Sequence, residues 1–313
     1  MKTRIITAAV LLPVFFAILY IFPPFVLTIV VSIICGIAVF ELLNVTGIGK
    51  NKKVLVYAII SAVLVPQAIY ISALYDAFRA DTILVQTESG GYIIPEPVFF
   101  SLTLITLIFS LFFILVCLLF IEAVLAFKNE KVEEKGKHLK FRQIPIVICA
   151  GIVIPCMLSS VVSLKAMPYG HFFVLLPVIS TILADSGAYF TGIFFGKRKA
   201  FPKISPHKTV EGCIGGVITG TIGMMIYGMI LTSVTYTTSM IIVFPALMIY
   251  GIIGAVVTEF GDLVFSFIKR KYDVKDYGKL IPGHGGVLDR FDSIIFTAPV
   301  MYLLIWIFPA IVY

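Results

Sequence analysis

Nine stretches of predominantly apolar residues run through this chain and leave it few ways to fold. A helix needs about 20 such residues to cross roughly 30 Å of hydrocarbon. The runs cover residues 5–22, 25–45, 54–74, 98–126, 144–163, 171–195, 213–236, 238–265 and 291–312. They are apolar on all sides, whereas the strands of a membrane barrel alternate every second residue. The sequence therefore predicts an all-α, polytopic membrane protein with about nine transmembrane helices.

The positions of lysine and arginine predict the orientation of these helices, because cytoplasmic loops retain basic residues during insertion. With the N-terminus inside, 22 of the 24 basic residues fall in cytoplasmic segments, and only Arg79 and Lys165 fall outside. We therefore expect a cell-membrane protein with a cytoplasmic N-terminus and an external C-terminus. The net charge of +7 follows from this distribution and gives no reason to expect a nucleic-acid partner.

Polar residues divide the chain at about residue 143. Residues 1–143 form an N-terminal transmembrane region of about four helices without a chemical motif. Glu41 and Glu122 lie near the ends of their runs, where they can line a cavity or, as we rather expect, reach the membrane interface. Residues 144–313 form a C-terminal transmembrane catalytic region of about five helices, and this region contains three polar clusters.

The first two clusters lie around the end of the sixth run. Asp185 lies inside that run, where a carboxylate indicates either a functional site or a hydrogen bond between helices. The second cluster is a polar loop at residues 204–212, and it contains Ser205, Lys208, Thr209 and Glu211. Either hydroxyl can cap the next helix, with Lys208 and backbone N–H groups placed to hold a phosphate. The same loop can equally be an ordinary helix start.

The third cluster, residues 259–292, combines carboxylates, glycines and basic residues. Helical spacing places Glu259, Asp262 and Ser266 on one face. A glycine-rich loop follows, and Asp289 and Asp292 begin the last run at the positive end of its helix dipole. Magnesium takes oxygen ligands, usually one or two carboxylates together with substrate phosphates. Zinc is disfavoured because the four histidines are scattered and no cysteine lies near these carboxylates.

Residues 266–292 resemble the signature of the phosphatidate cytidylyltransferases, also called CDP-diacylglycerol synthases. The matching positions are Ser266, Lys269, Arg270, Lys275, Asp276, Gly278, Pro282, Gly283, His284, Gly285, Gly286, Asp289, Arg290 and Asp292. Two upstream elements, D-x-x-A-Y-x-x-G from Asp185 and I-S-P-x-K-T-x-E-G from Ile204, also resemble the family. His207 is a departure, since many members have a lysine or arginine there, and it removes a fixed positive charge.

The resemblance implies transfer of CMP from CTP to phosphatidate, giving CDP-diacylglycerol and pyrophosphate in phospholipid biosynthesis. It also implies that Asp262 and Asp289 ligate the catalytic Mg²⁺ and that a second, monovalent cation such as K⁺ lies nearby. The expected catalytic residues are Asp185, Asp262, Lys269, Arg270 and Asp289. The expected phosphate- or CTP-binding residues are Ser205, Lys208, Thr209, Glu211, Ser266, Lys275, His284, Gly285, Gly286 and Arg290. By itself, His284 can be a general base, a phosphate donor or a loop hydrogen-bonding residue.

A lipid phosphate is already an anionic nucleophile, so this reaction needs charge neutralisation rather than a Ser, Cys or His nucleophile. CTP is cytoplasmic, which agrees with basic cytoplasmic loops and predicts an active site that faces the cytoplasm beside the lipid bilayer. Two alternatives stay open: a cytidylyltransferase or kinase for an isoprenoid lipid, and an ion-coupled secondary transporter using Asp185, Glu259 and Asp262. The sequence does not determine the oligomeric state, and a homodimer is one option.

Overall fold

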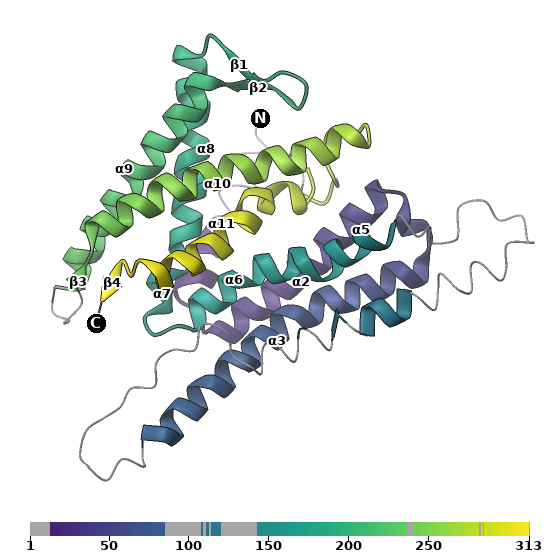
Figure 1. The fold of residues 1–313 in the computed structure, drawn as a ribbon, viewed down its shortest axis with the longest axis horizontal. Coiled ribbons are helices and arrows are strands. Elements are labelled where there is room, and N and C mark those ends of the chain that lie inside the picture. The colour runs from purple at the N-terminus through teal and green to yellow at the C-terminus, as the bar shows by residue number, and fades with distance from the viewer. Residues whose placement is uncertain are drawn as a thin grey trace, which may run out of the picture. The chain divides into compact units, whose positions relative to one another are not determined.

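The computed structural model describes residues 13–84, 108, 111–112, 114–119, 143–236, 241–281, 283 and 285–312. These residues form two compact units (Figure 1). Unit 1 contains the described residues of segments 1–20 and 171–313, and unit 2 contains those of segment 21–170. The division by contacts thus falls later in the chain than the division by chemical motifs at residue 143.

Unit 2 is built from helices that pack along one another. Its elements are α2 (Pro24–Val45), η1 (Ile48–Lys50), α3 (Lys52–Leu84), α5 (Ile144–Ile148), the π-turn η3 (Cys149–Val153) and α6 (Ile154–Ala166). Helices α2 and α3 are joined by a hydrogen bond of 3.0 Å from Gln67 Nε2 to Ser32 Oγ. Gly36 lets the two helices approach closely, because a Cβ there would lie 3.3 Å from the Val63 side chain.

Unit 1 carries all the predicted chemistry. After the helical residues 13–20, its elements are α7 (Gly170–Phe173), α8 (Leu175–Phe195), β1 (Lys199–Phe201), β2 (Ser205–Thr209), α9 (Val210–Val234), β3 (Ile241–Ile242), α10 (Phe244–Lys271), α11 (Leu288–Ile307) and β4 (Ile311–Val312). Glycines allow α8 and α9 to pack closely: a Cβ at Gly187 would overlap Thr219, and one at Gly215 would overlap Thr191. Small residues at such positions are typical of helix pairs in membranes.

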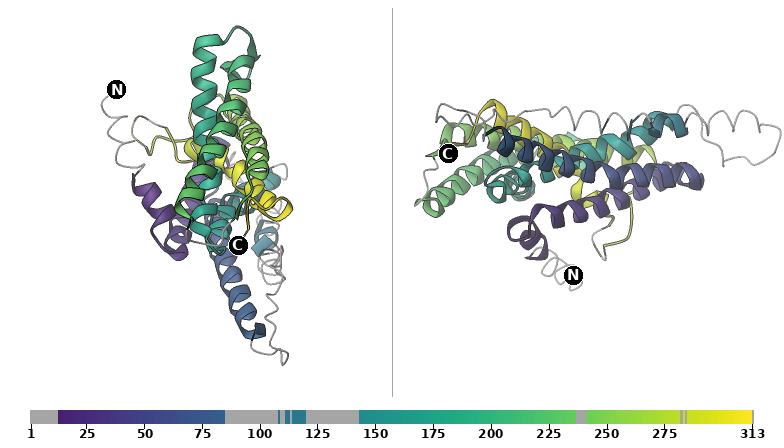
Figure 2. Two further views of the ribbon diagram at one scale, coloured as in Figure 1. Left: turned by 90° about the vertical axis from the view of Figure 1, so that its left-hand side faces the viewer. Right: turned by 90° about the horizontal axis from the view of Figure 1, so that it is seen from below.

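Two short antiparallel strand pairs mark opposite ends of α9 (Figures 1 and 2). Strands β1 and β2 form a hairpin between α8 and α9, so the segment predicted as a loop is partly extended. At the other end, β3 pairs with β4 near the C-terminus. The loop between α10 and α11 lies at the hairpin end, because Arg270 Nε donates a hydrogen bond of 3.3 Å to the Ile204 carbonyl oxygen. The second and third polar clusters therefore meet.

Hydroxyl groups join three helices of unit 1 one turn away from predicted site residues. Thr181 on α8 and Thr258 on α10 have their hydroxyl oxygens 3.3 Å apart, and Thr258 and Thr297 on α11 are 3.1 Å apart. The Thr297 hydroxyl donates to the Ser293 carbonyl at 2.9 Å. Because each hydroxyl has one proton, Thr258 must donate to Thr297 and accept from Thr181. This series of hydrogen bonds holds α8, α10 and α11 together one helical turn before Asp185 and Asp262.

Seven helices are long and apolar enough to cross a membrane among the described residues. They are Pro24–Val45, Lys52–Tyr75, Ile144–Ala166, Gly170–Phe195, Val210–Val234, Phe244–Lys271 and Leu288–Ile307. Each matches one predicted run, which confirms a helical, multi-pass membrane protein. Of the predicted runs 5–22 and 98–126, the structure describes only residues 13–22, 108, 111–112 and 114–119, so the total of nine and the sides of the termini stay predictions.

Candidate active site

One face of α10 carries a polar stripe, as its spacing predicted. Ser266 Oγ donates a hydrogen bond of 3.3 Å to Asp262 Oδ1. Lys208 of β2 reaches the same face, and its Nζ pairs with Asp262 Oδ2 at 2.8 Å and with Glu259 Oε2. A residue of the hairpin thus bridges two carboxylates of α10.

The charge state of Lys208 follows from this environment. Burial of its side chain, which is 18% exposed, lowers the pKa of the ammonium group. The charges and hydrogen bonds of Asp262 and Glu259 raise that pKa by more, so the net shift is upward. Lys208 is therefore a permanent cation over the physiological range of pH.

Asp289 organises the loop that precedes α11. Its Oδ2 accepts hydrogen bonds from the backbone N–H groups of Tyr277, at 2.8 Å, and Gly286, at 3.0 Å. Its Oδ1 accepts from Lys269 Nζ at 3.0 Å. The Asp289 side chain is only 2% exposed, so these partners replace the water that the carboxylate loses. The predicted metal ligand is thus also the residue that holds the loop closed.

The tight turn beside Asp289 requires glycine. Gly285 has a φ of +89°, and a Cβ there would lie 3.2 Å from Asp289 Oδ2 and 3.3 Å from Asp276 Oδ1. A side chain at position 285 would therefore be strained and would crowd two carboxylates. Tyr277 completes the loop: its hydroxyl donates to the Phe265 carbonyl at 2.9 Å, and burial with Asp289 and Asp292 raises its pKa.

Asp185 and Asp292 complete an acid cluster, defined as Asp185, Glu259, Asp262, Asp289 and Asp292. Asp185 on α8 interacts electrostatically with Glu259, Asp262 and Asp292. Asp292 on α11 interacts with Asp262, Asp289 and Lys269, and so links the two lysine–carboxylate pairs. Within the part of the chain that the structure describes, Lys208 and Lys269 are the basic residues paired with the cluster. Five carboxylates and two ammonium groups leave a formal charge of −3.

The donor set of the acid cluster suits a hard cation. All five donors are carboxylates, which favour Mg²⁺ over Zn²⁺. Glu259 Oε1 is buried and has no hydrogen-bond partner, so one acceptor oxygen is not satisfied by the protein. Across the described ranges, however, no three His, Cys, Asp or Glu side chains converge into a preformed metal site. A cation here would need substrate phosphates or water as further ligands, which is the usual situation for Mg²⁺.

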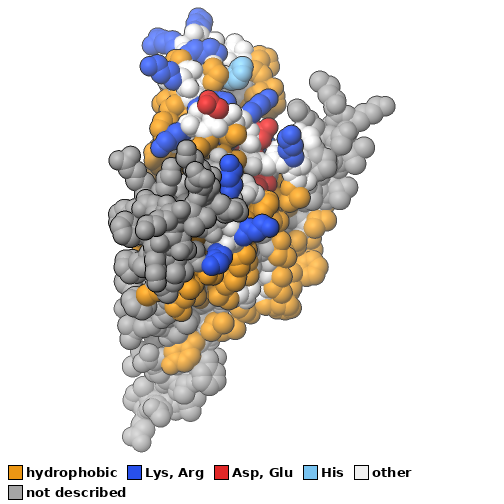
Figure 3. Space-filling view, turned by 90° about the vertical axis from the view of Figure 1, so that its right-hand side faces the viewer, with side chains coloured by type: hydrophobic (Ala, Val, Ile, Leu, Met, Phe, Trp, Pro, Cys, Tyr) orange, Lys and Arg blue, Asp and Glu red, His pale blue; other side chains and the backbone are white. Residues whose placement is uncertain are grey.

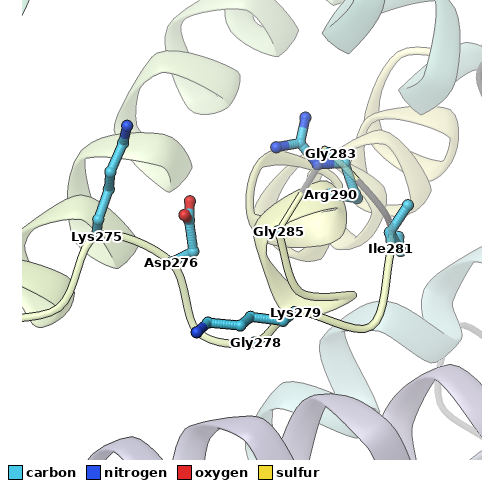
Figure 4. A pocket seen from close by; sticks show the side chains of 8 residues that line it. All are labelled: Lys275, Asp276, Gly278, Lys279, Ile281, Gly283, Gly285 and Arg290. Atoms are coloured by element: carbon cyan, nitrogen blue, oxygen red, sulfur yellow. The ribbon is translucent and has the colours of Figure 1, made fainter. Parts of the chain in front are cut away.

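A pocket of about 580 Å³ opens in the loop between α10 and α11. It is lined by Lys275, Asp276, Gly278, Lys279, Ile281, Gly283, Gly285 and Arg290. Figure 4 shows the Lys275 and Asp276 side chains extending in the same direction from the loop, and Arg290 projecting from the start of α11. The cationic side chains of Lys275, Lys279 and Arg290, together with the glycine backbone, suit a ligand with several phosphate groups.

The surface around this region is basic. Figure 3 shows lysine and arginine side chains gathered at the end that carries the β1–β2 hairpin, with acidic side chains visible between them. Hydrophobic side chains are also widely exposed among the described residues of this face, as a membrane-embedded protein requires. A soluble anion can therefore approach the acid cluster from the hairpin end.

Other predicted site residues build the hairpin. Thr209 caps α9 by accepting a hydrogen bond of 3.1 Å from the Gly212 N–H, which is the helix-capping role considered for it. Glu211 accepts from the backbone N–H groups of Lys197 and Arg198, each at 3.1 Å. Ser205 pairs with Phe201 across the hairpin. His284 lies outside the described residues, so its predicted role stays a prediction.

Two members of the acid cluster were absent from the predicted site set. The sequence could have identified Glu259 as a site residue, because it is three residues before Asp262 on the same helix. Asp292 is three residues after Asp289 at the start of α11 and carried the same signal. Both were noticed as polar positions, but only the tertiary structure shows that they share counterions with the predicted residues.

Comparison with known proteins shows the family to which this chain is similar. The model of the "Cytidylyltransferase family" matches residues 2–308. The chain is 36% identical over 169 residues to the phosphatidate cytidylyltransferase of Bacillus subtilis, covering 54% of this chain and 60% of that protein. It is 39% identical over 144 residues to the phosphatidate cytidylyltransferase of Thermotoga maritima, covering 46% and 53%. It is also 46% identical over 136 residues to the uncharacterized protein YnbB of Escherichia coli, covering 44% and 43%. The chain thus spans about half the length of the curated relatives it matches.

Proposed function

Because this chain belongs to the cytidylyltransferase family, we propose that it transfers the cytidylyl group of CTP to phosphatidate, forming CDP-diacylglycerol and pyrophosphate. One observation carries the proposal: the acid cluster, of which Glu259, Asp289 and Asp292 are buried, and a glycine-rich basic pocket lie at the same end of unit 1 and share the loop held by Asp289. The relatives from Bacillus subtilis and Thermotoga maritima are named phosphatidate cytidylyltransferase, which supports this choice of substrates.

The proposed chemistry is a substitution at phosphorus. A phosphate oxygen of phosphatidate attacks the α-phosphorus of CTP, the bond from that phosphorus to the oxygen bridging to the β-phosphate breaks, and pyrophosphate leaves. Both reactants are anions, so the main task of the protein is to neutralise and align them. Lys275, Lys279 and Arg290 would hold the triphosphate in the pocket. Arg270, which is hydrogen-bonded to the Ile204 carbonyl, would add positive charge beside the hairpin.

The proposed cofactor is Mg²⁺, held by Asp262 and Asp289. When bound, Mg²⁺ supplies Lewis-acid polarisation of the phosphate oxygens. The formal charge of −3 on the acid cluster and its two lysines equals the charge that one divalent and one monovalent cation, such as K⁺, would balance. Asp185 contributes to this charge from α8. Lys269 holds Asp289 against the loop and so orients the proposed ligand.

The membrane location fits the proposed lipid substrate. The acid cluster lies where membrane-spanning helices α8, α10 and α11 meet the hairpin end, so the acyl chains can stay in the bilayer while the headgroup reaches the carboxylates. We propose that this end faces the cytoplasm, since the basic residues of 197–208 and 269–290 gather there and CTP is cytoplasmic.

A labelled-nucleotide assay tests this function. Purified chain in lipid nanodiscs would receive Mg²⁺ and either α-labelled or γ-labelled CTP, with phosphatidate, diacylglycerol or an isoprenyl phosphate as acceptor. We expect the α-label in a lipid product, the γ-label in pyrophosphate, and turnover only with phosphatidate. Transfer of the γ-label to a lipid would indicate a kinase, and a product only with isoprenyl phosphate would indicate a different acceptor. Ion flux without any nucleotide–lipid product would indicate a transporter.

A further inference from the structure

The ammonium group of Lys208 pairs with the Asp262 carboxylate, which a divalent cation would need as a ligand. Asp262 Oδ2 pairs with the Lys208 ammonium at 2.8 Å, and Asp262 Oδ1 accepts the Ser266 hydroxyl. Both oxygens of Asp262 therefore have partners in the protein alone, as do both oxygens of the second proposed ligand, Asp289. Since like charges repel strongly in a partly buried site, a metal ion and the ammonium group cannot share Asp262 Oδ2.

Glu259 offers Lys208 a second carboxylate that is more deeply buried. The Glu259 side chain is 10% exposed, against 29% for Asp262. Its Oε2 already pairs with Lys208, while its Oε1 is buried without a hydrogen-bond partner. An ammonium group has three N–H donors, of which these two ion pairs use two. Glu259 therefore has acceptor capacity left for Lys208 if Asp262 is withdrawn.

From this geometry we propose that Lys208 is the resident counterion of Asp262 and Glu259 in the metal-free acid cluster, and that Glu259 is a positioning residue that retains Lys208 when a divalent cation takes Asp262. The inference rests on the proposed function only in assuming that such a cation binds at Asp262. Lys208 then stays beside the cluster instead of swinging into solvent, and its N–H groups remain available to substrate phosphates. The exchange needs no change in protonation.

Three variants separate this arrangement from simpler ones. Lys208→Met removes the competitor, so the divalent cation should bind about tenfold more tightly or better, as expected for a close charge pair. Glu259→Gln leaves Lys208 with Asp262 alone, so binding should weaken by about tenfold or more on the same basis. The double variant has the formal charge of the wild type but no lysine to displace, and it should bind at least as tightly as the wild type.

The measurement is a Mn²⁺ titration of the purified full chain in detergent, without CTP, with free Mn²⁺ followed by electron paramagnetic resonance. Mg²⁺ competition then gives its affinity. Lys203→Met is the matched control, because Lys203 is an exposed residue of the same hairpin and the charge change is identical. Lys208→Gln replaces Lys208→Met if the latter is not monodisperse, and Glu259→Asp should retain most of the wild-type affinity.

Three results would overturn the inference. Affinity that does not rise in Lys208→Met, or that rises equally in Lys203→Met, would mean that Lys208 does not compete for the site. A double variant that binds more weakly than the wild type would make Glu259 a direct metal ligand. Mn²⁺ binding that does not saturate in any variant would mean that no divalent cation competes with Lys208 for Asp262. The proposed function fails separately, because the predicted order of affinities can hold in a chain that forms no CDP-diacylglycerol.

Discussion

Replacing Asp289 with asparagine should destabilise the chain even when no metal is bound. Asp289 is 2% exposed and accepts three hydrogen bonds, two from backbone N–H groups and one from Lys269. An asparagine has a single acceptor oxygen. If that oxygen keeps Tyr277 and Gly286, the new amide N–H₂ faces the Lys269 ammonium, donor against donor. The variant therefore breaks a buried ion pair, at a cost of about 3 kcal/mol in the free energy of unfolding.

Thermal unfolding in EDTA, followed by the fluorescence of Trp306, measures this cost without the metal. A loss of about 3 kcal/mol corresponds to a fall in Tm of roughly 6–12 °C for a folded unit of about 150–250 residues, the size range of unit 1. Asp262→Asn is the matched control, since the Asp262 side chain is 29% exposed and Lys208 keeps Glu259 as a partner. We expect it to lose less than half as much. Equal Tm values for wild type and Asp289→Asn in EDTA would refute the assignment of Asp289 as the anchor of the loop.

Three further predictions concern other parts of the site. Thr258→Val should lower the free energy of unfolding by about 1 kcal/mol, because it breaks the series of hydroxyl hydrogen bonds from Thr181 to Thr297. Thr258→Ser and the control Thr221→Val should stay near wild type, and equal losses in the two Val variants would contradict this. Gly285→Ala should raise KM for CTP with a smaller effect on Tm, because a Cβ at a φ of +89° distorts the pocket; an unchanged KM would argue against it. Turnover should vanish in EDTA and return with Mg²⁺ or Mn²⁺ but not with Zn²⁺, because the donors are carboxylates; full turnover in EDTA would exclude the cation.

The sequence predicted the helices because hydropathy over about 20 residues is a local property. It also predicted the polar face of α10, since residues three and four apart on a helix share a face. Thr209 was identified as a candidate cap, and it caps α9. Each of these features depends on neighbouring residues only.

The contacts of Lys208 and Asp289 could not be predicted from the sequence, because they depend on the tertiary structure. Lys208 is 51 residues from Glu259, and their pairing depends on how the hairpin between α8 and α9 folds against α10. The strands of that hairpin have three and five residues, too few for an alternating pattern. Asp289 appeared as a metal ligand because carboxylates suit Mg²⁺, but its bonds to the backbone N–H groups of Tyr277 and Gly286 depend on the folded loop.

The most direct test of the central claim, that Asp262 and Asp289 serve one metal-dependent transfer site, is a double-mutant cycle on kcat/KM. Each residue is replaced by asparagine, alone and together, and CDP-diacylglycerol formation is measured for variants that purify as monodisperse protein. If both carboxylates hold one cation, either single variant loses most of the activity, on the order of several kcal/mol of transition-state stabilisation, and the double variant is scarcely worse. Near-wild-type turnover in either single variant, or losses that multiply fully above the assay floor, would show that the two residues do not share a site.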